Sequence, residues 1–169
     1  EVEHLEKLVS DVLIYAKPLD PHKEPSDMRA VVEGALAMVE KSLKDKNIQV
    51  HKRFSENLGS VPVDQAMLRQ ALINLFQNAS DAMEPGGKLT VSLRDMKDSV
   101  EVEIEDNGCG IHEDDLPYLF NPFFTRKSYG TGLGLTQVKK IVDQHGGEIE
   151  VTSRKGEGTR FIISLPRVS

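Results

Sequence analysis

The stretch KLTVSLRDMKDSVEVEIED, residues 88–106, contains two consecutive runs in which every second residue is apolar. The alternating positions are Leu89, Val91 and Leu93, then Val100, Val102 and Ile104. This alternation is typical of β-strands that have one buried face and one face in contact with water. Parallel strands buried on both faces would be continuously apolar, so the stretch predicts a sheet that helices cover on one side only.

The rest of the chain changes between helical and strand-like spacing. Helices are predicted over residues 1–16, from Ser26 and Asp27 as caps to Leu43, over 64–83 and over 134–145, with strands near 48–54, 149–151 and 161–165. Three prolines predict a linker over residues 17–25. We therefore expect an α+β fold, a two-layer α/β sandwich whose mixed sheet is covered on one face by about three helices, preceded by a short N-terminal helix.

Composition excludes several classes of protein. The 169 residues carry 21 basic and 27 acidic side chains, a net charge of −6, which disfavours a nucleic-acid surface. The single cysteine, Cys109, excludes an internal disulfide framework and favours a reducing compartment. No stretch approaches the ~20 apolar residues that span a bilayer. We expect a cytoplasmic domain and, because the chain starts at Glu1, a fragment of a longer protein.

The predicted helix over 64–83 has an unusual polar face. Opposite its apolar half lie Gln70, Asn74, Gln77, Asn78 and Asp81. Asn and Asp are poor helix formers, so their presence in mid-helix costs stability that contact with a ligand would offset. The alternative is an amide-rich face that only contacts solvent.

The segment Asp106-Asn107-Gly108-Cys109-Gly110-Ile111 begins where a predicted strand ends. Its glycines allow the backbone to approach a flat or phosphate-bearing ligand, and the carboxyl group of Asp106 can accept a hydrogen bond from an exocyclic amine. The alternative is a simple Asn-Gly turn. We expect Cys109 to be a small buried filler rather than a redox sensor.

A second glycine-rich segment, Gly130-Thr131-Gly132-Leu133-Gly134-Leu135, precedes the helix over 134–145. Backbone N–H groups at a helix N-terminus favour bound phosphate, although a flexible hinge is the alternative. Between the two glycine-rich segments, Phe120, Phe123 and Phe124 indicate either a lid that docks and undocks or a local plug of the core. Arg126 and Lys127 would bring positive charge towards phosphates.

The order of these segments resembles the N box, first glycine box, F box and second glycine box of the sensor histidine kinase catalytic domain. That ATP-binding domain belongs to a superfamily shared with DNA gyrase, chaperones and mismatch-repair ATPases, and the resemblance implies its Bergerat-type fold. The segments are Asn74 to Ala79, Asp106 to Gly110, Phe120 to Phe123 and Gly130 to Leu135. The forms Phe-Phe-Thr-Arg-Lys, residues 123–127, and Gly-Thr-Gly-Leu-Gly-Leu, residues 130–135, look like the nitrogen-regulatory subgroup. Residues 1–22 look like the end of the second helix of the dimerisation and phosphoacceptor domain plus a linker, and residues 23–169 like the catalytic domain.

The resemblance implies a role for each matching residue. Asn78 would coordinate Mg²⁺ on ATP, with Asn74 as a catalytic support one turn away, and Asp106 would accept the adenine amino group. Lys127 would neutralise the phosphates. The further residues expected to bind the nucleotide are Asp81, Gly108, Gly110, Gly130, Thr131, Gly132, Leu133, Gly134 and Thr159.

The implied function is transfer of the γ-phosphoryl group of Mg·ATP to a histidine on an upstream segment. None of His4, His22, His51, His112 and His145 has the context of a phosphoacceptor, and we interpret all five as surface or helix-end residues. The chain should therefore bind Mg·ATP without phosphorylating itself. It should also hydrolyse ATP slowly, since gyrase-like relatives have a glutamate in place of Asn74.

The expected partners are the phosphoacceptor helix of the same kinase, a response regulator receiver domain and a second copy in a homodimer, with no nucleic acid. The whole protein is expected to be cytoplasmic, or the cytoplasmic part of a membrane-anchored sensor. The alternatives are an anti-sigma-type serine kinase of the same superfamily and a non-catalytic nucleotide-binding signalling module.

Overall fold

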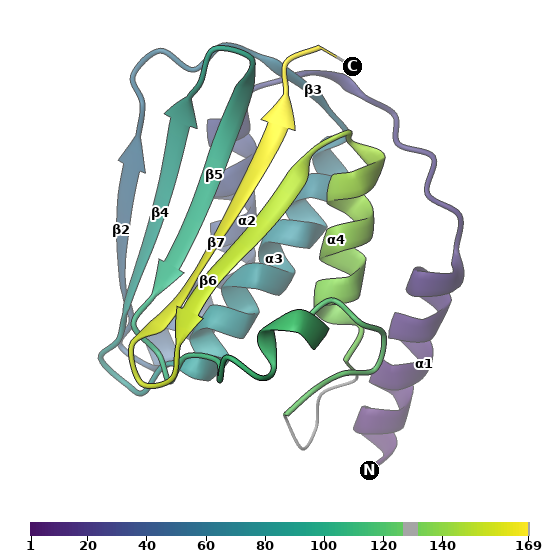
Figure 1. The fold of residues 1–169 in the computed structure, drawn as a ribbon, viewed down its shortest axis with the longest axis vertical. Helices are drawn as coiled ribbons and strands as arrows, with labels where there is room; N and C mark the ends of the chain where they lie inside the picture. Colours follow the sequence, from purple (N-terminus) through teal and green to yellow (C-terminus); the bar gives the residue numbers. More distant parts are fainter. Residues whose placement is uncertain (127–131, 169) are drawn as a thin grey trace.

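A computed structural model describes residues 1–126 and 132–168, in which a five-stranded sheet packs against a layer of helices (Figure 1). The helices are α1 (Val2–Ala16), α2 (Met28–Asp45), α3 (Gln65–Ala82), α4 (Gly134–Gln144) and the short 3-10 helix η1 (Leu116–Tyr118). The strands are β1 (Glu24–Ser26), β2 (Gln49–Phe54), β3 (Val61–Val63), β4 (Lys88–Asp95), β5 (Ser99–Asp106), β6 (Glu148–Arg154) and β7 (Gly158–Pro166). The helices and the long strands lie where the sequence patterns predict them.

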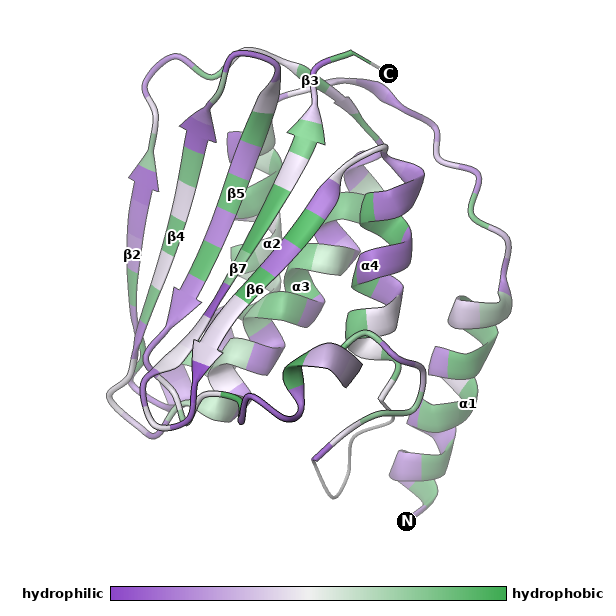
Figure 2. Ribbon diagram, viewed as in Figure 1, coloured by the Kyte–Doolittle hydropathy of each residue, from purple (hydrophilic) through white to green (hydrophobic). Residues whose placement is uncertain are grey.

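The main sheet is mixed. Its strand order is β2-β4-β5-β7-β6, with β2 parallel to β4 and each of the other neighbouring pairs antiparallel. Helices α2, α3 and α4 lie on one face of this sheet (Figure 1), and hydrophobic and hydrophilic residues alternate along β5 (Figure 2). The predicted α+β sandwich with one covered face is confirmed.

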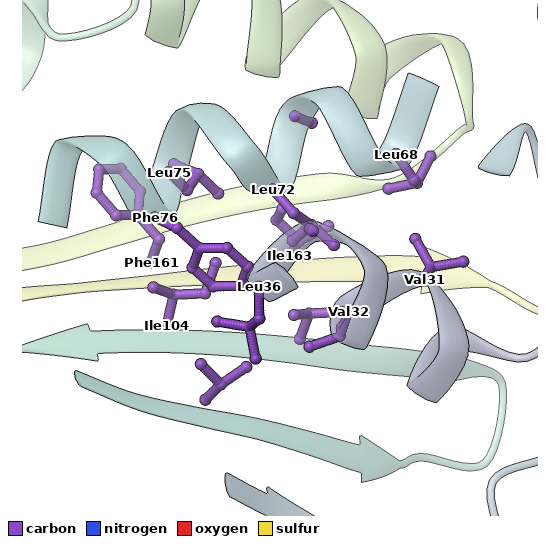
Figure 3. Packing of buried hydrophobic residues seen from close by; sticks show 14 of the residues in the cluster. Val31, Val32, Leu36, Leu68, Leu72, Leu75, Phe76, Ile104, Phe161 and Ile163 are labelled. Atoms are coloured by element: carbon purple, nitrogen blue, oxygen red, sulfur yellow. The ribbon is translucent and has the colours of Figure 1, made fainter. Parts of the chain in front are cut away.

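The core lies between the sheet and these helices. Phe76 and Leu72 of α3 pack with Leu36 of α2 against Ile104 and Ile163 of the sheet (Figure 3). Burial of each such side chain contributes about 1.5 to 3 kcal/mol. This packing fixes the apolar half of α3 on the sheet and turns its polar half towards α4 and the loops.

A small second sheet was not predicted. Glu24–Ser26 forms strand β1, so the predicted linker over 17–25 is wrong for its last two residues, which belong to this strand. Strand β1 pairs antiparallel with β3, and Pro25 lies opposite Pro62. Prolines cannot donate to a ladder, which explains why the sequence does not indicate a strand there.

The start of α2 is capped by one of the two residues predicted for this role. Asp27 is the N-cap and its side chain accepts from the N–H of Arg29 at 2.9 Å. Ser26 is buried, and its hydroxyl donates instead to Glu24 O at 2.7 Å. The cap prediction is therefore correct for Asp27 and wrong for Ser26.

Helix α1 stands beside α4, and none of its residues is buried (Figure 1). Its apolar residues, predicted to need a covering partner, remain in contact with solvent, as for Val2 at 71% and Leu13 at 65% exposed. The ammonium group of Lys140 in α4 donates to Tyr15 O at 2.7 Å and to Lys17 O at 3.1 Å. This contact holds the C-terminal end of α1.

Candidate functional site

A cavity of about 530 Å³ lies between α3, α4, α1 and the segment that follows β5. It brings together most of the residues that the sequence singled out. Those lining it are Asn74, Asn78, Asp81, Asp106, Gly110, Gly132, Gly134 and Thr159. Three of the other predicted site residues, Lys127, Gly130 and Thr131, lie outside the described residues.

The polar stripe of α3 forms one wall of the cavity because residues three and four apart share a helix face. The side-chain amide of Asn74 donates to Gln137 Oε1 at 3.3 Å and to Gly134 O at 3.4 Å, which ties the stripe to α4. One turn further on, Gln77 Nε2 donates to Asp81 Oδ1 at 3.0 Å. These bonds hold the wall in place before any ligand arrives.

Asp106 ends β5 at the inner edge of the cavity and is only 6% exposed. Its Oδ1 accepts from the N–H of Gly108 at 2.8 Å. Burial raises the pKa of the Asp106 carboxyl, while backbone hydrogen bonds from Gly108 and Thr159 oppose the rise. A buried carboxyl held by the backbone is suited to accept a hydrogen bond from one particular ligand group.

The two glycines after Asp106 have different surroundings. Gly110 lines the cavity with φ +71°, and a Cβ there would lie 1.9 Å from Arg154 O of the β6–β7 hairpin, so only glycine fits. Gly108 instead packs on the end of α3, where the neighbouring N–H of Cys109 donates to Ala82 O at 2.9 Å, and it is not part of the cavity lining.

At the second glycine-rich segment, Gly132 and Gly134 line the cavity, while Leu133 is buried and points elsewhere. The N–H of Phe123 donates to Gly132 O at 2.9 Å, and a Cβ at Gly132 would lie 2.2 Å from the carbonyl carbon of Phe123. Phe123 has the unusual φ of +66°. The backbones of Phe123 and Gly132 are therefore in close contact.

The phenylalanines of this segment divide between core and cavity. Phe120 packs partly buried against the core, whereas Phe124 lines the cavity and Phe123 is 59% exposed. Arg126 also lines the cavity, but its guanidinium group donates to both carboxylate oxygens of Asp115, at 2.8 and 3.2 Å. This positive charge, predicted to face phosphates, is already paired with a carboxylate.

Several cavity residues were missed from the sequence. Lys7, Asp11 and Ile14 of α1 line the cavity, as do His112 and Lys155 from the loops. Their contributions depend on how distant segments pack, and no local pattern indicates them. Cys109 is a correction, because it is exposed and lines the cavity, not a buried filler.

The cavity wall formed by α3 contains side-chain oxygens that could bind a metal ion. The amide oxygen of Asn78 and the carboxyl oxygens of Asp81 are the kind of ligand that Mg²⁺ prefers. Within residues 1–126 and 132–168, no group of three or more His, Cys, Asp and Glu side chains could hold a metal ion. In the same part of the chain, no helix has both the length and the apolarity needed to cross a bilayer.

Comparison with known proteins identifies the family. The family model for the histidine kinase-, DNA gyrase B- and HSP90-like ATPase matches residues 63–169. The chain belongs to this ATPase family. Within the family, this ATPase domain is of the histidine kinase type, since its curated relatives are sensor histidine kinases. Its predicted place in the nitrogen-regulatory subgroup stays a prediction.

One such relative is the sensor histidine kinase ZraS of Escherichia coli (strain K12), which is 34% identical over 166 residues. The alignment covers 98% of this chain but only 36% of ZraS, so the ATPase domain spans about a third of that relative.

Solved structures agree with this assignment. The catalytic domain of histidine kinase ThkA has 32% identity and a TM-score of 0.77, over 88% of this chain and 97% of that one. Full-length ShkA in complex with AMPPNP has 26% identity and a TM-score of 0.86, over 96% and 36%. ThkA in complex with the response regulator TrrA has 28% identity and a TM-score of 0.84, over 99% and 48%.

Proposed function

We propose that this ATPase domain is the catalytic part of a two-component sensor histidine kinase and positions Mg·ATP for transfer of the γ-phosphoryl group to a histidine. The observation that carries the proposal is that one cavity is lined by Asp106, Asn78 and Gly132, which come from three separate segments of the chain. The AMPPNP complex of the similar kinase ShkA supports a nucleotide as the ligand of this cavity.

The adenine base would lie at Asp106 and Thr159, with Gly110 beside it. The carboxyl group of Asp106 accepts the 6-amino group, which favours adenine over guanine. The phosphates would lie towards Gly132, Leu133 and Gly134, where N–H groups and the dipole of α4 favour negative charge. This orientation is supported by Asp106 and Gly132, one from each set, which line the same cavity. Gly108 would contribute by holding the Asp106 carboxyl, and Gly130, Thr131 and Lys127 would act on the phosphates.

Asn78 would hold Mg²⁺ through its amide oxygen, with Asp81 on the next turn close to the phosphates. The ion supplies charge neutralisation of the phosphates when it is bound. The chain's own residues then orient the nucleotide: Asn74, fixed by Gln137 and Gly134, supports the wall at Asn78.

The chemistry proposed is attack of a neutral imidazole on the γ-phosphorus, with charge stabilisation by the site rather than by a strong base. Asn74 cannot accept a proton in the way that a glutamate can, so activation of water, and with it hydrolysis, should be slow. The acceptor would be a histidine other than the five of this sequence.

We propose further that residues 1–22 belong to the dimerisation and phosphoacceptor unit and residues 23–169 to the catalytic domain. This division is supported by the buried core, whose members run from Met28 to Leu165, and by the lack of any buried residue in α1. The exposed apolar residues of α1, such as Leu5 and Leu13, would pack against helices of a second copy and the phosphoacceptor helix.

A response regulator receiver domain is proposed as the downstream partner, supported by the ThkA–TrrA complex among the similar structures. The kinase is proposed to act in the cytoplasm. Nothing in the comparisons favours the serine kinase or the non-catalytic module.

Calorimetry of the chain with ATP, ADP and GTP, each with Mg²⁺, tests the proposal. ATP and ADP should bind, and GTP should bind on the order of a hundredfold more weakly. Incubation with γ-labelled ATP should leave no label on the chain, and hydrolysis should stay far below the enzyme median of about 10 s⁻¹. Failure to bind ATP, or rapid turnover, would overturn the assignment.

A further inference from the structure

We propose that Ser153 is a positioning residue of the adenine end of the cavity, because its hydroxyl fixes the direction in which the Thr159 hydroxyl points its proton. The proposal rests on the nucleotide-binding function proposed above and adds a determinant of base selectivity. Ser153 does not itself line the cavity, whereas Thr159 does.

The Ser153 hydroxyl joins three segments of the chain. The N–H of Ile111, in the segment after β5, donates to Ser153 Oγ at 2.8 Å. Ser153 Oγ also lies 2.8 Å from Gly158 O and 2.8 Å from Thr159 Oγ1. Strands β6 and β7 place Ser153 and Thr159 directly opposite each other, so this contact follows from the register of the sheet.

The three contacts determine which group donates the proton in each hydrogen bond of the Ser153 hydroxyl. A serine hydroxyl has one proton and two lone pairs. The Ile111 N–H occupies one lone pair, and donation to Gly158 O uses the only proton of Ser153. The contact with Thr159 Oγ1 must then be made with the proton of Thr159, which leaves lone pairs on Thr159 for the cavity.

The adenine end would therefore present acceptors from two residues, Thr159 and Asp106, which are cross-strand partners on β7 and β5. Two acceptors suit the 6-amino group of adenine, directly or through a water. They disfavour binding of hypoxanthine or guanine. The 6-oxo oxygen of these bases is also an acceptor, so neither it nor the protein oxygen that faces it would have a hydrogen-bond donor.

The surrounding backbone keeps this arrangement rigid. Gly156 N–H donates to Cys109 O at 2.6 Å, and Gly110 packs directly on Arg154 O. The β6–β7 hairpin therefore cannot move away from the segment after β5 without breaking both contacts. Ser153 directly precedes Arg154, and its bond with Ile111 adds a third contact beside these two.

The test measures binding of Mg·ATP and Mg·ITP to the wild-type chain and to Ser153→Ala. In the base of ITP a 6-oxo group replaces the 6-amino group, and N1 carries a hydrogen. In the variant the Thr159 hydroxyl is free to rotate and donate to a 6-oxo group. We expect ATP to bind about tenfold more weakly while ITP binds as well or better, so that the ITP/ATP ratio of dissociation constants falls about tenfold or more. Ser164→Ala, on the opposite face of β7, is the matched control and should leave both constants unchanged.

Two further variants separate positioning from a structural role. Ser153→Thr keeps the hydroxyl and should bind ATP within about threefold of wild type. Combined with Thr159→Val, Ser153→Ala should add no further loss of ATP selectivity, because its effect passes through the Thr159 hydroxyl.

Equal weakening of ATP and ITP, additive losses in the double variant, or a Ser153→Thr variant as weak as Ser153→Ala would overturn the proposal. A wild-type chain that binds neither nucleotide would overturn the proposed function instead, so the two failures are distinguishable.

Discussion

Asp106 and Thr159 lie opposite each other, at the last residue of β5 and near the start of β7. Each is only 6% exposed, yet both line the cavity. Backbone hydrogen bonds from Gly108 and Thr159 reach the Asp106 carboxyl. The position of this carboxyl is therefore set by the sheet and by the turn that follows β5.

Replacing Asp106 with asparagine should reduce ATP affinity by roughly 2 kcal/mol, about 30-fold. The amide oxygen would stay bonded to the Gly108 N–H, so the amide nitrogen, a donor, would face the 6-amino group. The fold should not suffer. A pKa raised above the ordinary 3.8 means that the contribution of Asp106 to stability is present below that pH and is lost as the pH rises. At neutral pH the buried carboxyl thus costs stability, and Asp106→Asn should unfold at an equal or higher urea concentration.

Calorimetry and urea unfolding check both parts of this prediction. Glu105→Gln is the control, since Glu105 is the exposed neighbour of Asp106 on the same strand and does not line the cavity. Unchanged ATP affinity in Asp106→Asn would remove Asp106 from the site.

Asn78→Ala should remove the dependence of nucleotide binding on Mg²⁺. Mutating a residue that only supports a metal ligand typically lowers metal affinity about 10- to 100-fold, and loss of the ligand itself should cost at least as much. Mg·ATP should therefore bind about tenfold more weakly or worse. The measurement is the rise in melting temperature produced by ATP, with Mg²⁺ and with EDTA. The two rises should differ in wild type and in the control Gln144→Ala, and coincide in Asn78→Ala. A difference that survives in Asn78→Ala would contradict the assignment of the metal ligand.

His145 makes stability depend on pH. It ends α4 as expected, but its side chain is buried: Nε2 accepts from the N–H of Asp64 at 3.0 Å and Nδ1 lies 2.8 Å from Ile141 O. Burial lowers the pKa of His145, with Lys23 adding to the effect and Asp64 opposing it. Protonation of Nε2 would remove the acceptor for Asp64.

A pKa below the ordinary 6.5 means that this contribution is present above about pH 6.5 and is lost as the pH falls. At pH 5.5 the loss is at most about 1.4 kcal/mol. Urea unfolding between pH 5.5 and 7.5 measures it. His145→Gln, which retains an acceptor, should flatten the pH dependence, whereas exposed His51→Gln should not. An equal slope in wild type and His145→Gln would show that another group is responsible.

Lys140→Met should release α1. The lysine donates to two carbonyls at the end of this helix, and such charge-assisted bonds contribute about 1.5 to 3 kcal/mol, so amide exchange over residues 2–16 should become at least about tenfold faster. Lys139→Met is the matched control, since Lys139 pairs with Asp143 within α4. Exchange in the core should be unchanged in both variants. Unaltered exchange in α1 would mean that other contacts hold the helix.

The sequence by itself determined the layers of the fold and one wall of the site. The alternation over residues 88–106 depends only on the period of a strand, and the shared face of Asn74, Asn78 and Asp81 only on the period of a helix. Both are local properties, so they could be read without coordinates. The ends of the segments were also predictable where a cap is local, as at Asp27, but not at strand β1, whose pairing partner lies more than thirty residues away.

Only the tertiary structure decided which distant residues meet. The bond between Ser153 and Ile111, the burial of His145 beside Asp64 and the contact of Lys140 with Tyr15 join residues that are 42, 81 and 125 positions apart. Each depends on how whole elements pack, and packing is selected by the summed burial of many side chains rather than by the residues that make the contact. The same reason explains why the prediction for Cys109 was wrong. The flanking glycines suggested a small buried residue, but the packing of distant segments places Cys109 in the cavity wall.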